Sequence, residues 1–516
     1  MPTSPTEADS SFDLAVIGAG PAGLAGAVTA NELGLSVALL DASPQPGGQF
    51  YRHPAPALGA ARPEALHHDW PAFAALRDRL AAGTVRHLAE HHVWTVERLT
   101  GAEGGSRWRV HALTGAESER PVRIEARALL LATGAAERQL PFPGWTLPGV
   151  VSAGGAQAML KSGLVLPGRR VVVAGSGPLL LAVAATLVAA GARVPLIVEA
   201  SGYLEYARHP GVLAVSPGKL MEAAAHARTL LAHRVRPLTR HAITRVHGTS
   251  GESGAGTGVE AVTVSRLDRD WRPLPGGERR VACDAVAVGH GLVPQLDLAT
   301  GLGCAVRRTA DGAFALALDA RQETSVPGVW AAGETGGVGG ARLARVEGEL
   351  AALAIVSRLR GLPPLRTART RRLSRIRRRL RGFAEAMSAV HAPGPDWSRW
   401  LEDDTEVCRC EEVTAGCVRA AVDDLGARDP RSVKLLTRAG MGWCQGRICG
   451  AAVARLTGRP PAPDRRPLAA PVGLAALAAL PPADDPPPAA TADPISDPST
   501  ADTRPARSDT DRGDLP

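Results

Sequence analysis

A chain of 516 residues is too long for one ordinary hydrophobic core, so two or three domains are expected. Its hydrophobic content (45%) and charged content (21%) are typical of a globular protein, and its net charge of +8 accompanies no nucleic-acid-binding motif, so no nucleic-acid partner is expected. No stretch approaches the ~20 uninterrupted apolar residues of a membrane span, and the polar N-terminus is unlike a signal peptide; we therefore expect a cytoplasmic protein without a membrane span.

The first motif follows the apolar segment 12–17, which we expect to be a strand. A glycine-rich turn, an alanine-rich helix and a second strand over 36–40 ending at Asp41 complete a β-α-β unit. The first glycine permits a tight turn, the second lets the backbone approach a pyrophosphate, and the third lets helix and strand pack closely. Phosphates then lie on the amides of the helix N-terminus, and Asp41 can accept from a ribose hydroxyl. A dinucleotide site is predicted, with the turn residues Gly18, Gly20, Pro21, Ala22 and Gly23.

A second β-α-β unit begins with a strand at residue 170. Its turn, which includes Gly175 and Gly177, places Leu180 where the third glycine is expected, and its second strand ends at Glu199. An acid there is consistent with NAD rather than NADP. Because leucine pushes the helix away from the strand, three states of this unit remain open: a nicotinamide nucleotide, another nucleotide, or no ligand.

Three further segments follow strands in the order found in a known superfamily. They are Pro46-Gly47-Gly48-Gln49, Ala132-Thr133-Gly134 and Ala332-Gly333-Glu334, and with the first glycine turn they resemble the pyridine nucleotide-disulfide oxidoreductases. The resemblance implies FAD in the first unit, with Gly48 and Gln49 beside the flavin, Thr133 and Gly134 in the family's second turn, and Glu334 after Gly333 holding a ribityl hydroxyl. It also implies that the second unit is an inserted NAD-type domain.

Cysteine placement separates this chain from the thiol reductases of that superfamily. No cysteine precedes Cys283, and residues 150–156 are small where a thioredoxin reductase carries its CxxC pair, so a thiol substrate is not expected. We interpret Cys283, Cys304 and Cys417 as core residues.

Four late cysteines form two close pairs, flanked by Arg409 and Arg447, which would favour thiolates. Such a set can ligate a [2Fe–2S] cluster or a tetrahedral zinc ion. The predicted metal ligands are Cys408, Cys410, Cys444 and Cys449.

The segments CRCEEVT and TRAGMGWCQGRICG resemble the BFD-like [2Fe–2S] domain, in the version fused to FAD-binding alpha subunits of opine oxidases, hydrogen cyanide synthase and proline or hydroxyproline dehydrogenases. This resemblance implies a [2Fe–2S] cluster, a beta subunit that is an amino-acid-oxidase-like flavoprotein, and a small ferredoxin-like subunit. The chain would pass electrons between its FAD and the cluster.

The predicted fold is α/β: a flavoprotein with two dinucleotide-binding domains, like glutathione reductase, and a small, mainly helical [2Fe–2S] domain. The expected order is a first FAD-binding part (11–150), an inserted Rossmann-like domain (151–290), a second FAD-binding part (291–360), an arginine-rich linker or helix (361–400), the BFD-like domain (401–460) and a disordered tail rich in Pro, Ala and Asp (461–516).

Two features leave alternatives open. The arginine run 366–381 is interpreted as a solvated helix or linker, or alternatively as a docking face for an acidic partner. No catalytic residue is assigned, because the histidines fall in no motif and His290 is expected to be packed. Besides the electron-transfer subunit, two functions remain: a self-contained NAD(P)H-dependent FAD reductase, and a non-enzymatic scaffold with structural zinc.

Overall fold

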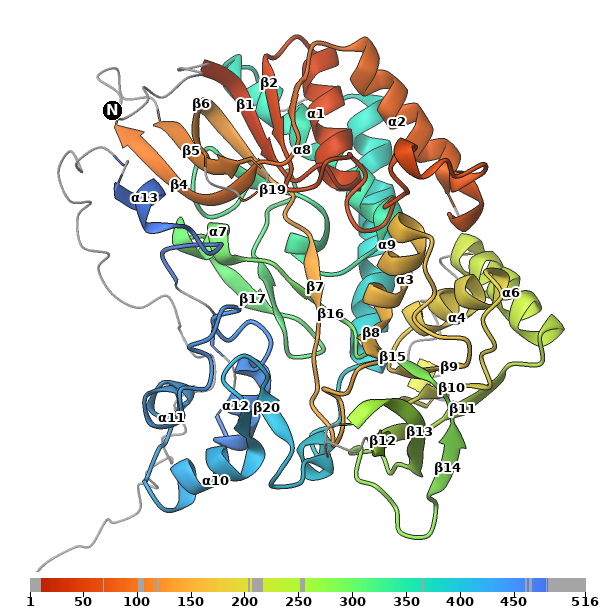
Figure 1. Cartoon of the computed structure of the whole chain (residues 1–516). Coiled ribbons are helices and arrows are strands. Elements are labelled where there is room, and N and C mark those ends of the chain that lie inside the picture. The colour runs from red at the N-terminus through yellow and green to blue at the C-terminus, as the bar shows by residue number, and fades with distance from the viewer. Residues whose placement is uncertain are drawn as a thin grey trace, which may run out of the picture. The chain divides into compact units, whose positions relative to one another are not determined.

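The computed structural model describes residues 11–67, 69–100, 106–115, 117, 120–202, 205–206, 217–250, 256–363, 366–459, 462–463, 466–478 and 480. The predicted α/β class is confirmed: two sheets with parallel strands are each accompanied by helices (Figure 1).

The first sheet has seven strands. Six of them follow the order β3-β2-β1-β6-β5-β4, and the seventh, β19, pairs the last residues of β6. β1, β2, β3, β6 and β19 are parallel, whereas β4 and β5 continue the sheet as an antiparallel meander. The strands are β1 (Ser11–Ile17), β2 (Val37–Leu40), β3 (Arg86–Leu88), β4 (His92–Thr100), β5 (Ser106–Thr114), β6 (Arg120–Leu131) and β19 (Val329–Ala331).

Helices α1 (Pro21–Glu32) and α8 (Ala341–Leu359) pack against each other beside this sheet, and α2 (Trp70–Ala82) lies next to α1 (Figure 1). The approach of α1 to α8 requires glycine, because a Cβ on Gly348 would stand 2.1 Å from the carbonyl oxygen of Ala22. Short 3-10 turns η1 (Pro56–Leu58), η2 (Pro63–Leu66) and η4 (Gly333–Gly336) complete this region.

The second sheet is wholly parallel, with the order β11-β10-β9-β15-β8. Its central strands are buried, which explains their continuous apolar sequences. The elements are β8 (Val150–Ser152), α3 (Ala153–Gly163), β9 (Val171–Gly175), α4 (Leu179–Ala189), β10 (Leu196–Glu199), α6 (Pro217–Ala232), β11 (Arg236–Thr239) and β15 (Ala285–Gly289).

Smaller sheets were not predicted from the sequence. β12 (His241–Ser250), β13 (Gly256–Arg266) and β14 (Arg279–Ala282) form an antiparallel sheet, and β7 (Ala135–Glu137) pairs β16 (Leu292–Pro294) where the chain passes between the two main sheets. The remaining elements of this part are α7 (Asp297–Gly301), β17 (Val306–Arg308) and β18 (Phe314–Leu316).

From residue 368 on, the arginine run lies in one helix, α9 (Ala368–Val390), which is capped at its N-terminus by the hydroxyl of Thr367. Of the interpretation as a solvated helix or linker, the helix is confirmed, but two of its arginines are not solvated. Arg377 and Arg381 donate to the fully buried carboxylate of Glu347 in α8, at 3.2 and 2.6 Å, so these two arginines attach α9 to the body.

The cysteine-rich segment folds into short elements: η5 (Trp397–Trp400), β20 (Glu406–Cys408), β21 (Val413–Thr414), α10 (Ala415–Asp423), α11 (Pro430–Thr437) and α12 (Gly450–Leu456). It shares a hydrophobic core with the second sheet and the β12–β14 sheet. Trp400 stacks on Trp271 with ring centroids 5.9 Å apart, and Trp145 donates to the carbonyl of Glu406 at 2.7 Å. These contacts fix the cysteine-rich segment against the flavoprotein body.

The predicted domain boundaries stay predictions, and contacts join the described residues between 11 and 478 into a single unit. Of the predicted disordered tail (461–516), the structure describes residues 462–463, 466–478 and 480, which include α13 (Leu474–Ala478), and the rest of that prediction lies outside the described residues. The amide of Ala469 there donates to the carbonyl of Trp94 at 2.8 Å. Among the helices that the structure describes, none has the length and apolarity that crossing a membrane requires.

Candidate cofactor sites

The first glycine turn has the geometry that a dinucleotide site requires. Gly18 has φ of +104°, and a Cβ there would lie 2.3 Å from the carbonyl oxygen of Ala132; a Cβ on Gly23 would lie 1.8 Å from the carbonyl oxygen of Gly18. Gly20 caps α1, whose N-terminus receives no side-chain cap. The first amides of α1 therefore remain available to a phosphate group.

Asp41 holds the glycine turn in place. Its Oδ2 accepts from the amide of Ala19 at 2.5 Å and its Oδ1 accepts from the amide of Ser43 at 2.7 Å. The side chain remains partly exposed at the end of β2, so lone pairs are left for a ligand hydroxyl.

The segment predicted to lie beside the flavin, residues 46–49, packs against this glycine turn. The amide of Gly47 donates to the carbonyl of Ala19 at 2.8 Å, and a Cβ on Gly48 would lie 2.8 Å from the Cα of Gly20. This approach requires glycine at position 48, which also has φ of +58°. The Oε1 of Gln49 accepts from Arg52 at 2.8 Å.

The two later motifs reach the same edge of the sheet, since β6 and β19 are parallel neighbours ending beside β1. The hydroxyl of Thr133 donates to the carbonyl of Gln295 at 2.8 Å, and Gly134 has φ of +76° with open space beyond its Cα. The Glu334 carboxylate accepts from the amides of Gly339 and Gly340 at 2.6 and 2.9 Å.

Burial raises the pKa of Glu334, although the two amide hydrogen bonds act to lower it. The amide of Gly333 donates to Glu347 at 3.1 Å, so this turn is linked to α8 and α9. The residues predicted for FAD thus lie together at one sheet edge. They fit a dinucleotide that carries a pyrophosphate, while the role of each residue stays a prediction.

The second glycine turn differs from the first in both backbone and environment, since Gly177 has φ of +119° where Gly20 has φ of −72°, and α4 begins only at Leu179. Gly175 has φ of +135°, and a Cβ there would lie 1.7 Å from the carbonyl oxygen of Gly289. Glu199 accepts from the amides of Gly177 and Ser201 at 3.0 and 2.9 Å, and it is only 3% exposed. The acid that the sequence places beside a ribose is therefore buried, and the turn before it departs from the backbone of the first.

The group that covers Glu199 is His391, the residue at the C-terminus of α9. Its Nδ1 lies 3.6 Å from Oε1 of Glu199 and 3.2 Å from the hydroxyl of Ser176, and its Nε2 lies 2.6 Å from the hydroxyl of Tyr206. Ser176 of the turn and Tyr206 thus meet the imidazole that lies against Glu199, the acid expected to face a ribose. The sequence showed nothing of this, because His391 and Glu199 lie in segments far apart along the chain.

The four predicted metal ligands lie around one cavity of about 410 Å³. The thiols contact in two pairs, Cys408 with Cys449 and Cys410 with Cys444. Cys408 and Cys449 are buried, whereas Cys410 is exposed and Cys444 half-buried. Burial raises the pKa of Cys449, and the amide of Gly440 donates to Sγ of Cys408 at 3.5 Å.

Within the described part of the chain, no three His, Cys, Asp or Glu side chains converge as ligands of one metal ion. Two pairs of thiols suit a two-iron cluster, in which each iron takes two cysteines, better than a single tetrahedral zinc ion. Arg447, expected to favour thiolates, instead donates to Asp297 at 3.0 Å. The prediction that Cys417 belongs to the core is wrong, since it is exposed on α10, whereas Cys283 and Cys304 are buried as predicted.

The same cavity also touches the flavoprotein body. Its wall includes Trp145 from the turn before β8, and Ser152, Gly155 and Val288 from the strand ends and the start of α3 at the second sheet. The cysteine cavity therefore lies directly against the second sheet.

Two basic side chains, His290 and Lys161, are buried. His290 is packed against Trp271 and Trp400 as expected, and burial lowers its pKa to about 3. Sequence reasoning missed Lys161 of α3, one of only three lysines in the chain. It is 8% exposed and donates to the carbonyl of Phe50 at 3.4 Å, and burial lowers its pKa to about 8.

Comparison with known proteins agrees with this geometry. Residues 12–348 match the pyridine nucleotide-disulphide oxidoreductase family, and residues 406–457 match the BFD-like [2Fe–2S] binding domain. The chain therefore belongs to the pyridine nucleotide-disulphide oxidoreductases and carries a BFD-like domain. It is a flavoprotein oxidoreductase whose cofactors are FAD and a [2Fe–2S] cluster.

Two relatives match this chain over most of its length. The chain is 34% identical to the opine oxidase A subunit of Agrobacterium tumefaciens, over 87% of this chain and 86% of that protein. It is also 34% identical to the HcnB subunit of hydrogen cyanide synthase from Pseudomonas aeruginosa, over 84% and 90% of the two chains. The fold is shared with L-proline dehydrogenase from P. horikoshii, with a TM-score of 0.61, 19% identity, and 91% and 81% coverage.

Proposed function

We propose that this chain is the electron-transfer alpha subunit of a heteromeric dehydrogenase that oxidises a CH–NH bond in an opine, proline or hydroxyproline type of substrate. When bound, FAD and the [2Fe–2S] cluster supply the redox chemistry. The protein holds the two cofactors at fixed positions and excludes solvent from the space between them. A partner subunit, which is an amino-acid-oxidase-like flavoprotein, binds and oxidises the substrate.

The observation that carries the proposal is the contrast between the two glycine turns. Both turns leave the helix that follows without a side-chain cap, so the contrast lies in the acids. Asp41 beside the first turn is partly exposed, whereas Glu199 beside the second is buried with His391 against it, and Tyr206 contacts His391. A nicotinamide nucleotide would have to displace these side chains and break their hydrogen bonds. This favours a flavin that receives electrons from a partner over one reduced by NAD(P)H.

The position of the cysteine cavity also supports an electron-transfer role. The four thiols face the body through Ser152 and Gly155, while the loop before Cys444 faces outward with Trp443 81% exposed. Three other large apolar side chains of this loop and α11 are exposed, namely Leu435, Leu436 and Met441. An exposed apolar patch beside a redox site is typical of a docking surface.

The charge around this patch suggests its partner. Residues 428–447 contain five basic side chains and one acid, Asp429. We therefore propose that an acidic electron carrier, the small ferredoxin-like subunit, docks here. A cytoplasmic location belongs to the same proposal, and seven free thiols suit a reducing compartment.

Anaerobic addition of NADH or NADPH to the purified holoprotein tests the main proposal. We expect no rapid bleaching of the flavin absorbance, while the chain assembled with its catalytic partner is bleached by the amine substrate. Rapid bleaching by NADH alone would instead establish a self-contained reductase. Metal analysis tests the remaining alternative, since zinc without iron would make the chain a scaffold.

His391→Ala provides an internal check on the same proposal. Removing the imidazole opens the space beside Glu199, so NADH binding should strengthen in this variant if His391 fills the site. His241→Ala is a matched control, because that histidine lies on β12 and its ring contacts the carbonyl of Thr239, at 2.7 Å, rather than the glycine turn.

A further inference from the structure

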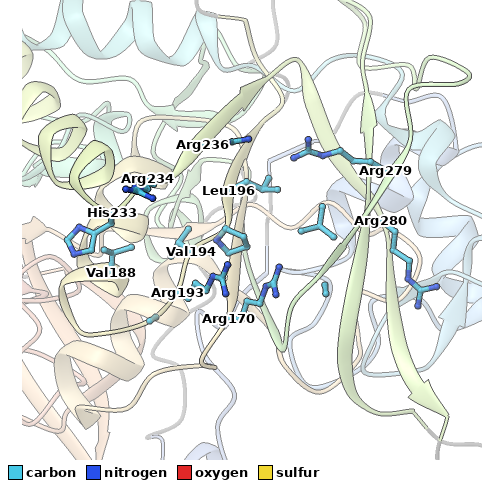
Figure 2. A pocket seen from close by; sticks show the side chains of 14 residues that line it. Arg170, Val188, Arg193, Val194, Leu196, His233, Arg234, Arg236, Arg279 and Arg280 are labelled. Atoms are coloured by element: carbon cyan, nitrogen blue, oxygen red, sulfur yellow. The ribbon is translucent and has the colours of Figure 1, made fainter.

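A second concave surface lies at the edge of the second sheet opposite to its glycine turn. Arg170 precedes β9, Arg193 lies just before β10, and Arg236 begins β11, whereas Gly175 ends β9. β14 of the antiparallel sheet forms the facing wall. Figure 2 shows Arg170 and Arg193 next to each other, with Arg279 and Arg280 on one side of them and His233 and Arg234 on the other. The cavity has a volume of about 690 Å³.

The lining is strongly basic. It contains six arginines and His233 but no aspartate or glutamate, and the arginines are Arg170, Arg193, Arg234, Arg236, Arg279 and Arg280. Among the described side chains, Arg280 is the one of these six arginines that forms an ion pair, with Glu260, and the backbone amide of Arg170 donates to the carboxylate of Asp284 at 2.8 Å. The Nε of Arg170 is buried without a hydrogen-bond acceptor among the described residues. Like charges gathered around one concavity repel each other and focus a positive potential that attracts anions.

The size and chemistry of the groove point to a small ligand with several phosphate groups. Guanidinium groups bind phosphate oxygens through two parallel hydrogen bonds, and one phosphate can reach only a few of the six arginines. The floor between them is apolar, with Val194, Leu196 and Val281. Its volume falls within the usual range of small-molecule sites, about 300–1,000 Å³.

We propose that this groove binds a polyphosphate, either a nucleoside di- or triphosphate or an inorganic chain of phosphates. The site is distinct from both glycine turns, because it lies at the N-terminal ends of β9, β10 and β11. It does not depend on the identity of the substrate or of the electron carrier.

Calorimetric titration of the FAD-loaded full chain at 0.15 M salt tests this proposal with four probes: ATP, inorganic tripolyphosphate, adenosine and polyglutamate. We expect ATP and tripolyphosphate to bind and adenosine not to bind. ATP binding at least tenfold tighter than tripolyphosphate identifies a nucleotide site, and equal binding identifies a site for the phosphate chain.

The variant Arg193→Glu/Arg236→Glu should weaken tripolyphosphate binding at least tenfold. Its matched control is Arg372→Glu/Arg378→Glu, which makes the same change of charge at two positions of α9 and should alter binding less than twofold. ATP held at either glycine turn would bind the groove variant unchanged. If the groove variant loses its flavin, Arg193→Gln/Arg279→Gln replaces it with a smaller change of charge.

Three results would overturn the proposal. They are no binding of tripolyphosphate up to millimolar concentration, equal weakening in the α9 control, and tighter binding of polyglutamate than of tripolyphosphate. The last result would assign the groove to an acidic protein segment.

Discussion

The carboxylate of Glu347 accepts hydrogen bonds from three groups near the predicted flavin site. This carboxylate is fully buried, accepts from Arg377 and Arg381 of α9, and also accepts from the amide of Gly333 beside Glu334. Replacing Glu347 by alanine leaves two partly buried guanidinium groups unpaired and one buried amide without an acceptor. The variant Glu347→Ala should therefore loosen both α9 and the turn at Gly333.

The magnitude follows from these contacts. Removing one partner of a buried ion pair costs about 3–5 kcal/mol, and an unsatisfied buried amide adds about 1–3 kcal/mol. Because these two contributions overlap, we expect the free energy of unfolding to fall by about 5 kcal/mol in total. At about 2 °C per kcal/mol for a large domain, the midpoint of thermal unfolding should fall by roughly 10 °C.

The assay is thermal unfolding of the holoprotein followed by flavin fluorescence, which reports release of the cofactor. Glu349→Ala is the matched control, because Glu349 lies on the same helix and pairs with Arg369 in a more exposed position. The ion pair between Glu349 and Arg369 should contribute less than about 1 kcal/mol to the free energy of unfolding. Equal shifts for the two variants, or a fall of less than about 2 °C for Glu347→Ala, would refute the assignment of Glu347 as the link between α8, α9 and the flavin turn.

Three further predictions concern single side chains. Burial lowers the pKa of Lys161 to about 8 from 10.5, so the unfolded chain binds more protons between these values and stability should rise with pH in that window. Lys161→Met should abolish this rise in pH-dependent urea unfolding and stabilise the protein at pH 7 by up to about 3 kcal/mol; an unchanged pH profile would contradict it. Gly18→Ala should prevent FAD retention, measured by absorbance after gel filtration, whereas Gly382→Ala in α9 should retain FAD and gain up to about 1 kcal/mol. Cys444→Ser should lose iron and the visible absorbance of the cluster, while exposed Cys417→Ser should keep both; loss of iron in both variants would argue against the predicted ligand set.

Several parts of the fold could be predicted because their signals are local. A glycine at a positive φ, a strand that ends in an acid and a pair of close cysteines each express a backbone or ligand requirement within a few residues. The β-α-β units around Gly18 and Gly175 and the α/β class were therefore predictable. The antiparallel strands β4, β5 and β12–β14 were missed, although β5 carries a signal that could have found it: Trp108, Val110 and Ala112 alternate with polar residues and are buried.

The sequence by itself thus determined the cofactor-binding motifs. They are a dinucleotide turn with its acid, a second turn of the same sequence type, and two pairs of thiols. Only the tertiary structure decided how these parts are used. His391 reaches Glu199 from a distant part of the chain, Arg377 and Arg381 of the arginine run are held by Glu347, and six arginines from strand ends and loops gather around one groove. Each of these outcomes depends on side chains that meet through long-range packing, and no local pattern of residues encodes such a meeting.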